Sequence, residues 1–145
     1  MKAVIQRCHR GTVSVDGVIE GSIGPGLAVF LGVAKGDTLV DAERLARKIA
    51  SLRIFNDAEG RFNLSVRDKG GAALVISNFT LYGDTRKGAR PNFTAAAAPE
   101  LAQELYEAFV TLLRAEIGRV ETGVFAAAMD VTVENDGPMT MIIET

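Results

Sequence analysis

The stretch that decides the fold covers residues 72–93 and reads AALVISNFTLYGDTRKGARPNF. Its first part, Ala72 to Ile76, is a short apolar run of the kind that forms a buried strand. From Ser77 the sequence turns abruptly polar, and hydroxyl, amide and aromatic groups collect where the strand stops. Loops held by a rigid scaffold often carry binding or chemistry, so we expect a functional site here. The alternative is an ordinary strand followed by a solvated basic loop.

Short strand patterns surround this stretch. Asp16-Gly17 predicts a two-residue hairpin turn, because both residues tolerate a positive φ. The four residues Asn135-Asp136-Gly137-Pro138 join the last two strands, and a proline there must lie in a turn or at an edge. The predicted strands cover residues 3–8, 12–15, 18–20, 27–33, 53–55, 61–66, 72–76, 120–125, 129–134 and 139–144.

Two helical patterns interrupt the strands. Apolar residues recur at helical spacing from Ala42 to Leu52, and Thr38 with Asp41 forms an approximate capping box before them. Pro99 opens the second helix, and Gly118 ends it with a left-handed cap. The order of elements predicts an α+β fold, in which a mostly antiparallel, barrel-like sheet is covered by two helices. We expect residues 1–145 to form one domain.

Composition narrows the function classes. The net charge of −2 and the pI of about 5.4 give no global basic field, so any RNA contact must be local. Arg86, Lys87 and Arg90 offer such a local patch, although a solubilising loop has the same composition. The single cysteine, Cys8, cannot form an internal disulfide, and no stretch is long and apolar enough to span a membrane. We therefore expect a cytoplasmic protein.

Familiar catalytic groups are scarce. His9 is the only histidine, and its neighbour Cys8 points to the opposite face of the predicted strand. The chain has too few cysteine and histidine ligands for zinc, and it has no phosphate-binding P-loop, so we expect no metal and no cofactor. An enzyme of this composition would work by positioning, main-chain groups and hydroxyls, or would borrow a reactive group from its substrate.

Several motifs taken together resemble those of the D-aminoacyl-tRNA deacylases. The likeness covers essentially the whole chain, and the motifs occur in the same order as in that family. They are Met1-Lys2-Ala3-Val4-Ile5-Gln6-Arg7, Asn63 to Asp68, Ser77-Asn78-Phe79-Thr80-Leu81 running to Phe93, Thr122-Gly123-Val124-Phe125, and Asn135-Asp136-Gly137-Pro138-Met139-Thr140.

The resemblance implies a homodimer that hydrolyses the ester between a D-amino acid, or glycine, and the tRNA 3′ end. It implies a cis bond between Gly137 and Pro138, whose carbonyl oxygens enter the partner's active site and hold the substrate's α-ammonium. Arg7 matches the arginine that fixes this element. A base rate of about 5–6% cis for X-Pro bonds would otherwise favour trans.

The same resemblance assigns the pocket. Ser77, Phe79 and Thr80 match residues that receive the aminoacyl-adenosine, and Phe125 and Met129 match residues near it. Asn78 departs from the usual glutamine of that family. A substrate contact made by the longer glutamine side chain is therefore in question here, whereas a contact made by the main-chain N–H would be kept.

These assignments suggest RNA-assisted hydrolysis. The vicinal ribose hydroxyl would help activate water or the carbonyl, and main-chain N–H groups at Phe79 or Thr80 would form the oxyanion site. A covalent Thr80 nucleophile competes with this hypothesis, although no base is visible to activate it. A non-catalytic dimer that binds RNA ends, and a hydrolase of free peptides or esters, are the remaining alternatives.

Overall fold

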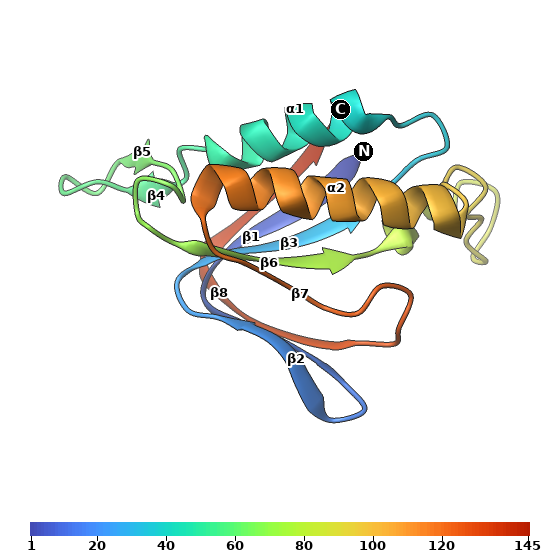
Figure 1. Cartoon of the computed structure of the whole chain (residues 1–145), viewed down its shortest axis with the longest axis horizontal. Helices are drawn as coiled ribbons and strands as arrows, with labels where there is room; N and C mark the ends of the chain where they lie inside the picture. Colours follow the sequence, from blue (N-terminus) through green and yellow to red (C-terminus); the bar gives the residue numbers. More distant parts are fainter.

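The computed structural model describes all of residues 1–145. Two α-helices lie on one face of a curved sheet, and a small hairpin protrudes at one end (Figure 1). The strands are β1 Lys2–Val15, β2 Val18–Ile23, β3 Gly26–Gly32, β4 Phe55–Asn56, β5 Phe62–Leu64, β6 Ala72–Ser77, β7 Val120–Thr122 and β8 Asp130–Glu144. The helices are α1 Leu39–Ala50, the short 3₁₀-helix η1 Phe79–Tyr82 and α2 Pro99–Ile117.

Strand β1 is the centre of the sheet. It pairs antiparallel with β3 and β2 and, along nearly its whole length, with β8. Strand β6 instead lies parallel to both β3 and β7. Three of these five pairings are antiparallel, so the predicted barrel-like sheet under two helices is confirmed, with a parallel section added. The parallel section arises because α1 and α2 each lie in a crossover between neighbouring strands.

The continuous apolar run of β6 is explained by two cores. Ala73 and Val75 face the main core beneath the helices, whereas Ala72, Leu74 and Ile76 face a smaller cluster inside the curl of the sheet. Both faces of the strand are therefore buried, as its composition predicts. Helices α1 and α2 close the main core with fully buried side chains that include Leu45, Ile49, Phe109 and Leu113.

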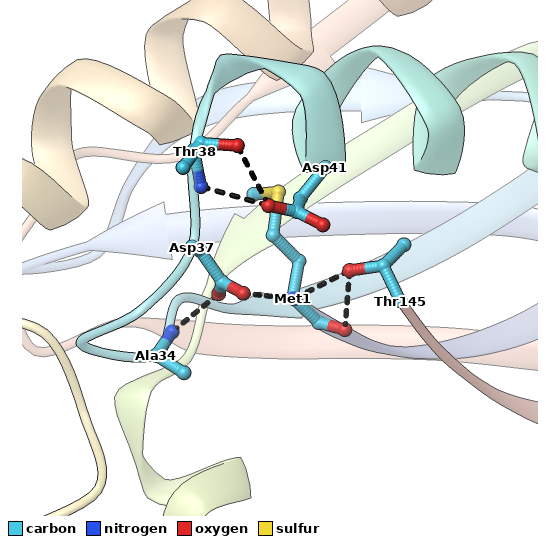
Figure 2. Close-up of polar contacts among 6 residues, drawn as sticks. All are labelled: Met1, Ala34, Asp37, Thr38, Asp41 and Thr145. Carbon is cyan, nitrogen blue, oxygen red and sulfur yellow. Dashed lines mark hydrogen bonds and ion pairs between the residues drawn. The ribbon is translucent and has the colours of Figure 1, made fainter.

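The helix predictions are confirmed in most details. Asp41 accepts hydrogen bonds from the main-chain N–H and the hydroxyl of Thr38, so the capping box is complete (Figure 2). Pro99 opens α2, and Gly118 ends it with a positive φ of 85°, although its ψ of −65° lies outside the left-handed helical region that was predicted. Both ends of α2 are thus set by the residues that propensity selects.

Several strand predictions were wrong in their boundaries. The predicted strands 53–55, 61–66 and 120–125 are replaced by the shorter β4, β5 and β7, and four other predicted strands merge into two. Residues 3–8 and 12–15 belong to one continuous strand, β1, because β8 pairs with it on both sides of Arg7. Residues 130–134 and 139–144 likewise belong to the single strand β8, and Met129 lies just before it. Within it, Gln6 pairs with Thr140 and Cys8 pairs with Asn135, so four residues of β8 stand opposite Arg7 alone. This excursion, residues 136–139, is called the elbow below.

The chain termini meet beside the start of α1 (Figure 2). The Met1 ammonium lies 2.6 Å from Asp37 Oδ1 and donates a hydrogen bond of 2.7 Å to the Thr145 hydroxyl. The other Asp37 oxygen accepts the N–H of Ala34 at 2.6 Å. Because Met1 is buried, this carboxylate compensates a charge that has lost its water. The contact fixes the β3–α1 connection, which begins where β3 leaves the candidate site.

Candidate functional site

The polar stretch after β6 folds back against the end of β3. The N–H of Asn78 donates to the carbonyl of Leu31 at 2.8 Å, which continues the sheet by one bond. Residues 79–82 then form η1, and the N–H of Gly83 closes it on the Thr80 carbonyl at 2.9 Å. The first N–H groups of a helix have no acceptor within it, so those of Phe79 and Thr80 are open to a ligand.

Tyr82 anchors this turn. Its ring lies so close to Gly32 that a Cβ built there would come within 3.1 Å of it. The Lys2 ammonium lies 5.2 Å from the ring centroid and also pairs with Glu144 at 2.8 Å. Burial raises the pKa of Tyr82 to about 12, helped by the nearby carboxylates, so the ring stays neutral. A side chain at position 32 would therefore press on Tyr82 and on the Asn78 carbonyl, which is 3.1 Å from the same built Cβ.

A cavity of about 470 Å³ opens between η1, α2 and the loop after β7. Its only ionisable lining group is the phenol of Tyr106, and the other polar side chains are two hydroxyls and one amide. The lining residues are Leu31, Val33, Ser77, Asn78, Phe79, Thr80, Ala97, Pro99, Ala102, Tyr106, Phe125, Ala126 and Ala127. The structure therefore brings Ser77, Asn78, Phe79, Thr80 and Phe125 together.

The Thr80 hydroxyl has an amide partner and no base. It donates to Asn78 Oδ1, and no histidine or carboxylate contacts it. The only histidine, His9, lies on β1 with its Nε2 3.5 Å from Asp136 Oδ1. The side-chain amide of Asn78 is thus used within the turn. This explains why an amide is retained at position 78, although asparagine is one methylene shorter than the glutamine that the resemblance implies.

Tyr106 is a cavity residue that the sequence analysis missed. Its hydroxyl donates to the Val75 carbonyl at 2.9 Å, and its ring centroid lies 5.8 Å from that of Phe125. Burial raises its pKa to about 12, so the phenol remains a neutral donor. The available signal was a tyrosine on the apolar face of α2, since a buried tyrosine usually has a partner for its hydroxyl.

Arg7 holds the elbow through contacts on both sides of its guanidinium. Its Nη1 donates to the Ile54 carbonyl at 2.6 Å, and its Nε lies 2.8 Å from Asp136 Oδ2. That distance fits an ion pair, although the N–H is not aligned for a hydrogen bond with the carboxylate. The Gly137–Pro138 peptide bond is cis, as the resemblance implies, and both residues are exposed.

Gly137 is required at the elbow for a backbone reason. Its φ of 126° lies in a region that L side chains rarely adopt. A Cβ built there would lie 2.9 Å from Met139 N and 3.3 Å from Arg7 Nη2. Any larger residue would therefore displace the elbow from its arginine.

The elbow and the cavity lie apart within one chain. Arg7, opposite the elbow, pairs with Leu27 at the start of β3, whereas Ser77 pairs with Leu31 near its end. At about 3.3 Å per residue, these levels differ by about 13 Å along the strands. Three strand spacings, about 14 Å, separate β8 from β6 across the sheet. One chain therefore does not join these two groups of residues into one site.

The remaining predicted residues are more dispersed. Met129 lies against Gly123 in the smaller core and does not line the cavity. In the loop after η1, Arg86 pairs with Asp84 at 2.7 Å, and these hydrogen bonds lower the pKa of that carboxyl to about 2. Lys87 and Arg90 are exposed and form no ion pair, so their charges are available.

The edge of the cavity carries an exposed aromatic pair. Phe79 is 58% exposed, and its ring meets Phe93 edge-on with centroids 5.1 Å apart. Phe93 belongs to the same basic loop, where Asp84 and Asn92 exchange main-chain hydrogen bonds of 2.8 and 2.9 Å. The loop is thus closed at its base, and Phe93 joins that base to the edge of the cavity.

Neither helix combines the length and apolarity that crossing a bilayer requires. The chain matches several relatives along its whole length. Proteins named D-aminoacyl-tRNA deacylase from Chloroflexus aurantiacus and Carboxydothermus hydrogenoformans are 58% and 51% identical to it. These alignments cover 100% and 99% of this chain and 91% and 99% of the relatives.

Solved structures share the fold. One titled c-Myc DNA unwinding element binding protein has 39% identity and a TM-score of 0.94, covering 100% of this chain and 99% of that one. Another, titled a probable eukaryotic D-amino acid tRNA deacylase, superposes with a TM-score of 0.85 over 98% of this chain and 97% of its own. At 18% identity the second likeness concerns the fold alone. The family described as D-Tyr-tRNA(Tyr) deacylase matches residues 4–144, and the chain belongs to this family of enzymes.

Proposed function

We propose that the protein hydrolyses the ester of D-aminoacyl-tRNA, and of glycine mischarged on tRNA, and spares L-aminoacyl-tRNA. The observation that carries the proposal is the cavity beside Ser77–Thr80, which offers hydroxyl, amide and main-chain groups but no acid–base pair. An aminoacyl-adenosine brings its own vicinal hydroxyl, so such a cavity suits it. The whole of residues 1–145 acts as one domain, in the cytoplasm where tRNA is charged.

The reaction depends on positioning. The terminal adenosine and its ester enter the cavity, and the N–H groups of Phe79 and Thr80 receive the developing oxyanion. The vicinal ribose hydroxyl assists attack by water, which releases the amino acid and leaves a free tRNA 3′ end. Orientation of this kind can lower a barrier by roughly 7–11 kcal/mol, without a protein nucleophile.

Handedness is read by the elbow of a second copy. The Gly137 and Pro138 carbonyls hold the α-ammonium, and an L side chain would then strike the elbow while a D side chain points outward. A homodimer is needed because the elbow and the cavity lie far apart within one chain. The exposure of Gly137 and Pro138 in the single chain supports this arrangement.

The nucleic acid is held by local charge. Arg86, Lys87 and Arg90 lie on the exposed loop that continues from η1, and contact phosphates near the 3′ end. Phe125 contributes an aromatic wall for the adenosine. Met129 acts indirectly, by packing on Gly123, two residues before Phe125.

A chirality-resolved assay tests this function. Purified protein is incubated with D-Tyr-tRNA, L-Tyr-tRNA and Gly-tRNA, and release of the amino acid is measured. We expect rapid release from the D and glycine substrates and about thousandfold slower release from the L substrate, a difference of about 4 kcal/mol. Equal rates on both enantiomers would contradict the elbow's role.

Nucleic-acid binding without hydrolysis is the second candidate. It is favoured by the solved structure at 39% identity whose title names DNA binding. The same assay distinguishes it, because a protein that only binds would release no amino acid from any of the three substrates.

A further inference from the structure

We propose that Phe62, on the β4–β5 hairpin, is a positioning residue for the elbow. Its ring covers the Arg7 guanidinium, and the guanidinium in turn holds Asp136 and Gly137. The consequence is that an exposed aromatic residue outside the cavity sets how sharply D is distinguished from L. This inference rests on the proposed function and names a residue that the reaction itself does not contact.

Arg7 is the bridge between hairpin and elbow. On one side its Nη1 binds the Ile54 carbonyl, which immediately precedes β4, at 2.6 Å. On the other side its Nε lies 2.8 Å from Asp136 Oδ2, and a Cβ built on Gly137 would lie 3.3 Å from its Nη2. A shift of this guanidinium would therefore move the elbow.

Two aromatic rings flank the same guanidinium. The Arg7 Cζ lies 5.7 Å from the centroid of Phe62 and 6.0 Å from that of Phe55. Both distances fall within cation–π range, and the attraction grows as the cation loses water. The arginine is only 7% exposed, so the rings, and not solvent, form much of its surroundings.

The two rings differ in what else they do. Phe55 is 8% exposed and belongs to the main core, so its removal would destabilise the whole fold. Phe62 is 58% exposed and belongs to neither core cluster. Its contact with Arg7 is therefore the specific role that the structure assigns to it. Without that ring, water would reach the guanidinium and weaken its pairing with Asp136.

The hairpin keeps its shape without Phe62. Arg53 binds the Asn63 main chain at 2.8 Å as well as its side chain, which ties the two arms. Asp57 accepts the N–H groups of Glu59 and Arg61 at 3.0 and 2.9 Å, which fixes the turn. A Phe62→Leu variant therefore removes the aromatic face and leaves an apolar side chain on an intact hairpin.

The test compares kcat/KM for D-Tyr-tRNA and L-Tyr-tRNA. Phe62→Leu should lower the D-to-L ratio by about fivefold, the effect of losing one partly buried cation–π contact, and should lower the melting temperature by only a few degrees. Phe62→Tyr keeps the ring and should retain the wild-type ratio. Ile19→Ala removes a similarly exposed apolar group from the β1–β2 hairpin and should also leave the ratio unchanged.

Two references separate this inference from the proposed function. Arg7→Lys keeps the positive charge but loses the several N–H donors of the guanidinium. The proposed function by itself, without a role for Phe62, predicts that this variant has a lower D-to-L ratio. If it does so while Phe62→Leu matches the wild type, the inference is wrong and the proposed function stands. If the wild type shows no preference for the D substrate, the proposed function fails and this inference with it.

A structural readout closes the test. Hydrogen exchange of the Arg7 Nε–H, followed by NMR, should be faster in Phe62→Leu than in the wild type or in Phe62→Tyr. Equal exchange in all three proteins would overturn the proposal, because the ring would then not shield the guanidinium.

Discussion

At the scale of single residues, the question is whether the Thr80 hydroxyl is a nucleophile. Thr80 donates to Asn78 and has no base beside it, so we assign it a supporting role. A Thr80→Ala variant should deacylate D-Tyr-tRNA within about tenfold of the wild type, because it loses one hydrogen bond. The measurement is single-turnover release of the amino acid.

The substrate provides the matched control for this prediction. A D-Tyr-tRNA that ends in 2′-deoxyadenosine should be hydrolysed far more slowly by the wild type, because the assisting hydroxyl is gone. Complete loss of turnover in Thr80→Ala with binding preserved, and normal hydrolysis of the deoxy substrate, would identify Thr80 as the nucleophile instead.

Tyr106 links cavity geometry to alkaline stability. Burial raises its pKa to about 12, above the ordinary value of 10, so its contribution is full below pH 10 and is lost as pH rises towards 12. By pH 11 the wild type should have lost about 1 kcal/mol more unfolding free energy than Tyr106→Phe, relative to pH 9. Urea unfolding of both proteins at the two pH values measures this, and parallel losses would contradict it.

Among the secondary elements, the connection between β3 and α1 depends on one buried ion pair. Asp37→Asn would leave the Met1 ammonium without its counter-charge, which should cost about 3–5 kcal/mol of unfolding free energy. Glu43→Gln is the control, because it breaks the exposed Arg47–Glu43 pair and should cost less than about 0.5 kcal/mol. Chemical unfolding of protein without residues before Met1 checks both, and equal losses would refute the assignment.

The loop after η1 should act through its charge alone. Lys87→Ala and Arg90→Ala should each weaken tRNA binding and reduce the salt dependence by about 0.7–0.9 in the log–log slope. Arg86→Ala should change the slope less, since Asp84 already neutralises that guanidinium. Titrations at several salt concentrations give these slopes, and identical slopes for all proteins would place the RNA elsewhere.

Local signals in the sequence predicted the helices and the buried strand well. Thr38, Asp41, Pro99 and Gly118 act within a single turn of chain, so their meaning does not depend on distant contacts. The continuity of β1 and β8 could not be predicted in this way, because each is maintained by pairing with the other. The parallel pairing of β6 is likewise a property of strand order in space.

In the candidate site, too, contiguous residues could be predicted from the sequence, whereas residues brought in by long-range packing could not. Ser77 to Thr80 are contiguous, so their shared cavity could be expected from the polar stretch after β6. Tyr106 lines the cavity because of how α2 packs, whereas Met129 packs against the smaller core and does not line the cavity. Arg7 and Gly137 are close to each other but far from the cavity, a separation that no linear motif reveals.

The central claim is that the elbow of one protomer completes the cavity of another. Gly137→Val displaces the elbow, and Ala97→Phe fills the cavity, so each homodimer should be inactive on D-Tyr-tRNA. In a mixed dimer one of the two sites combines an intact cavity with an intact elbow.

The most direct measurement is therefore D-Tyr-tRNA deacylation after the two inactive variants are unfolded together and refolded as a mixture. Random pairing makes half of the dimers mixed, each with one working site, so we predict about a quarter of wild-type activity. A mixture as inactive as either variant alone would show that the elbow does not act on the cavity of another copy.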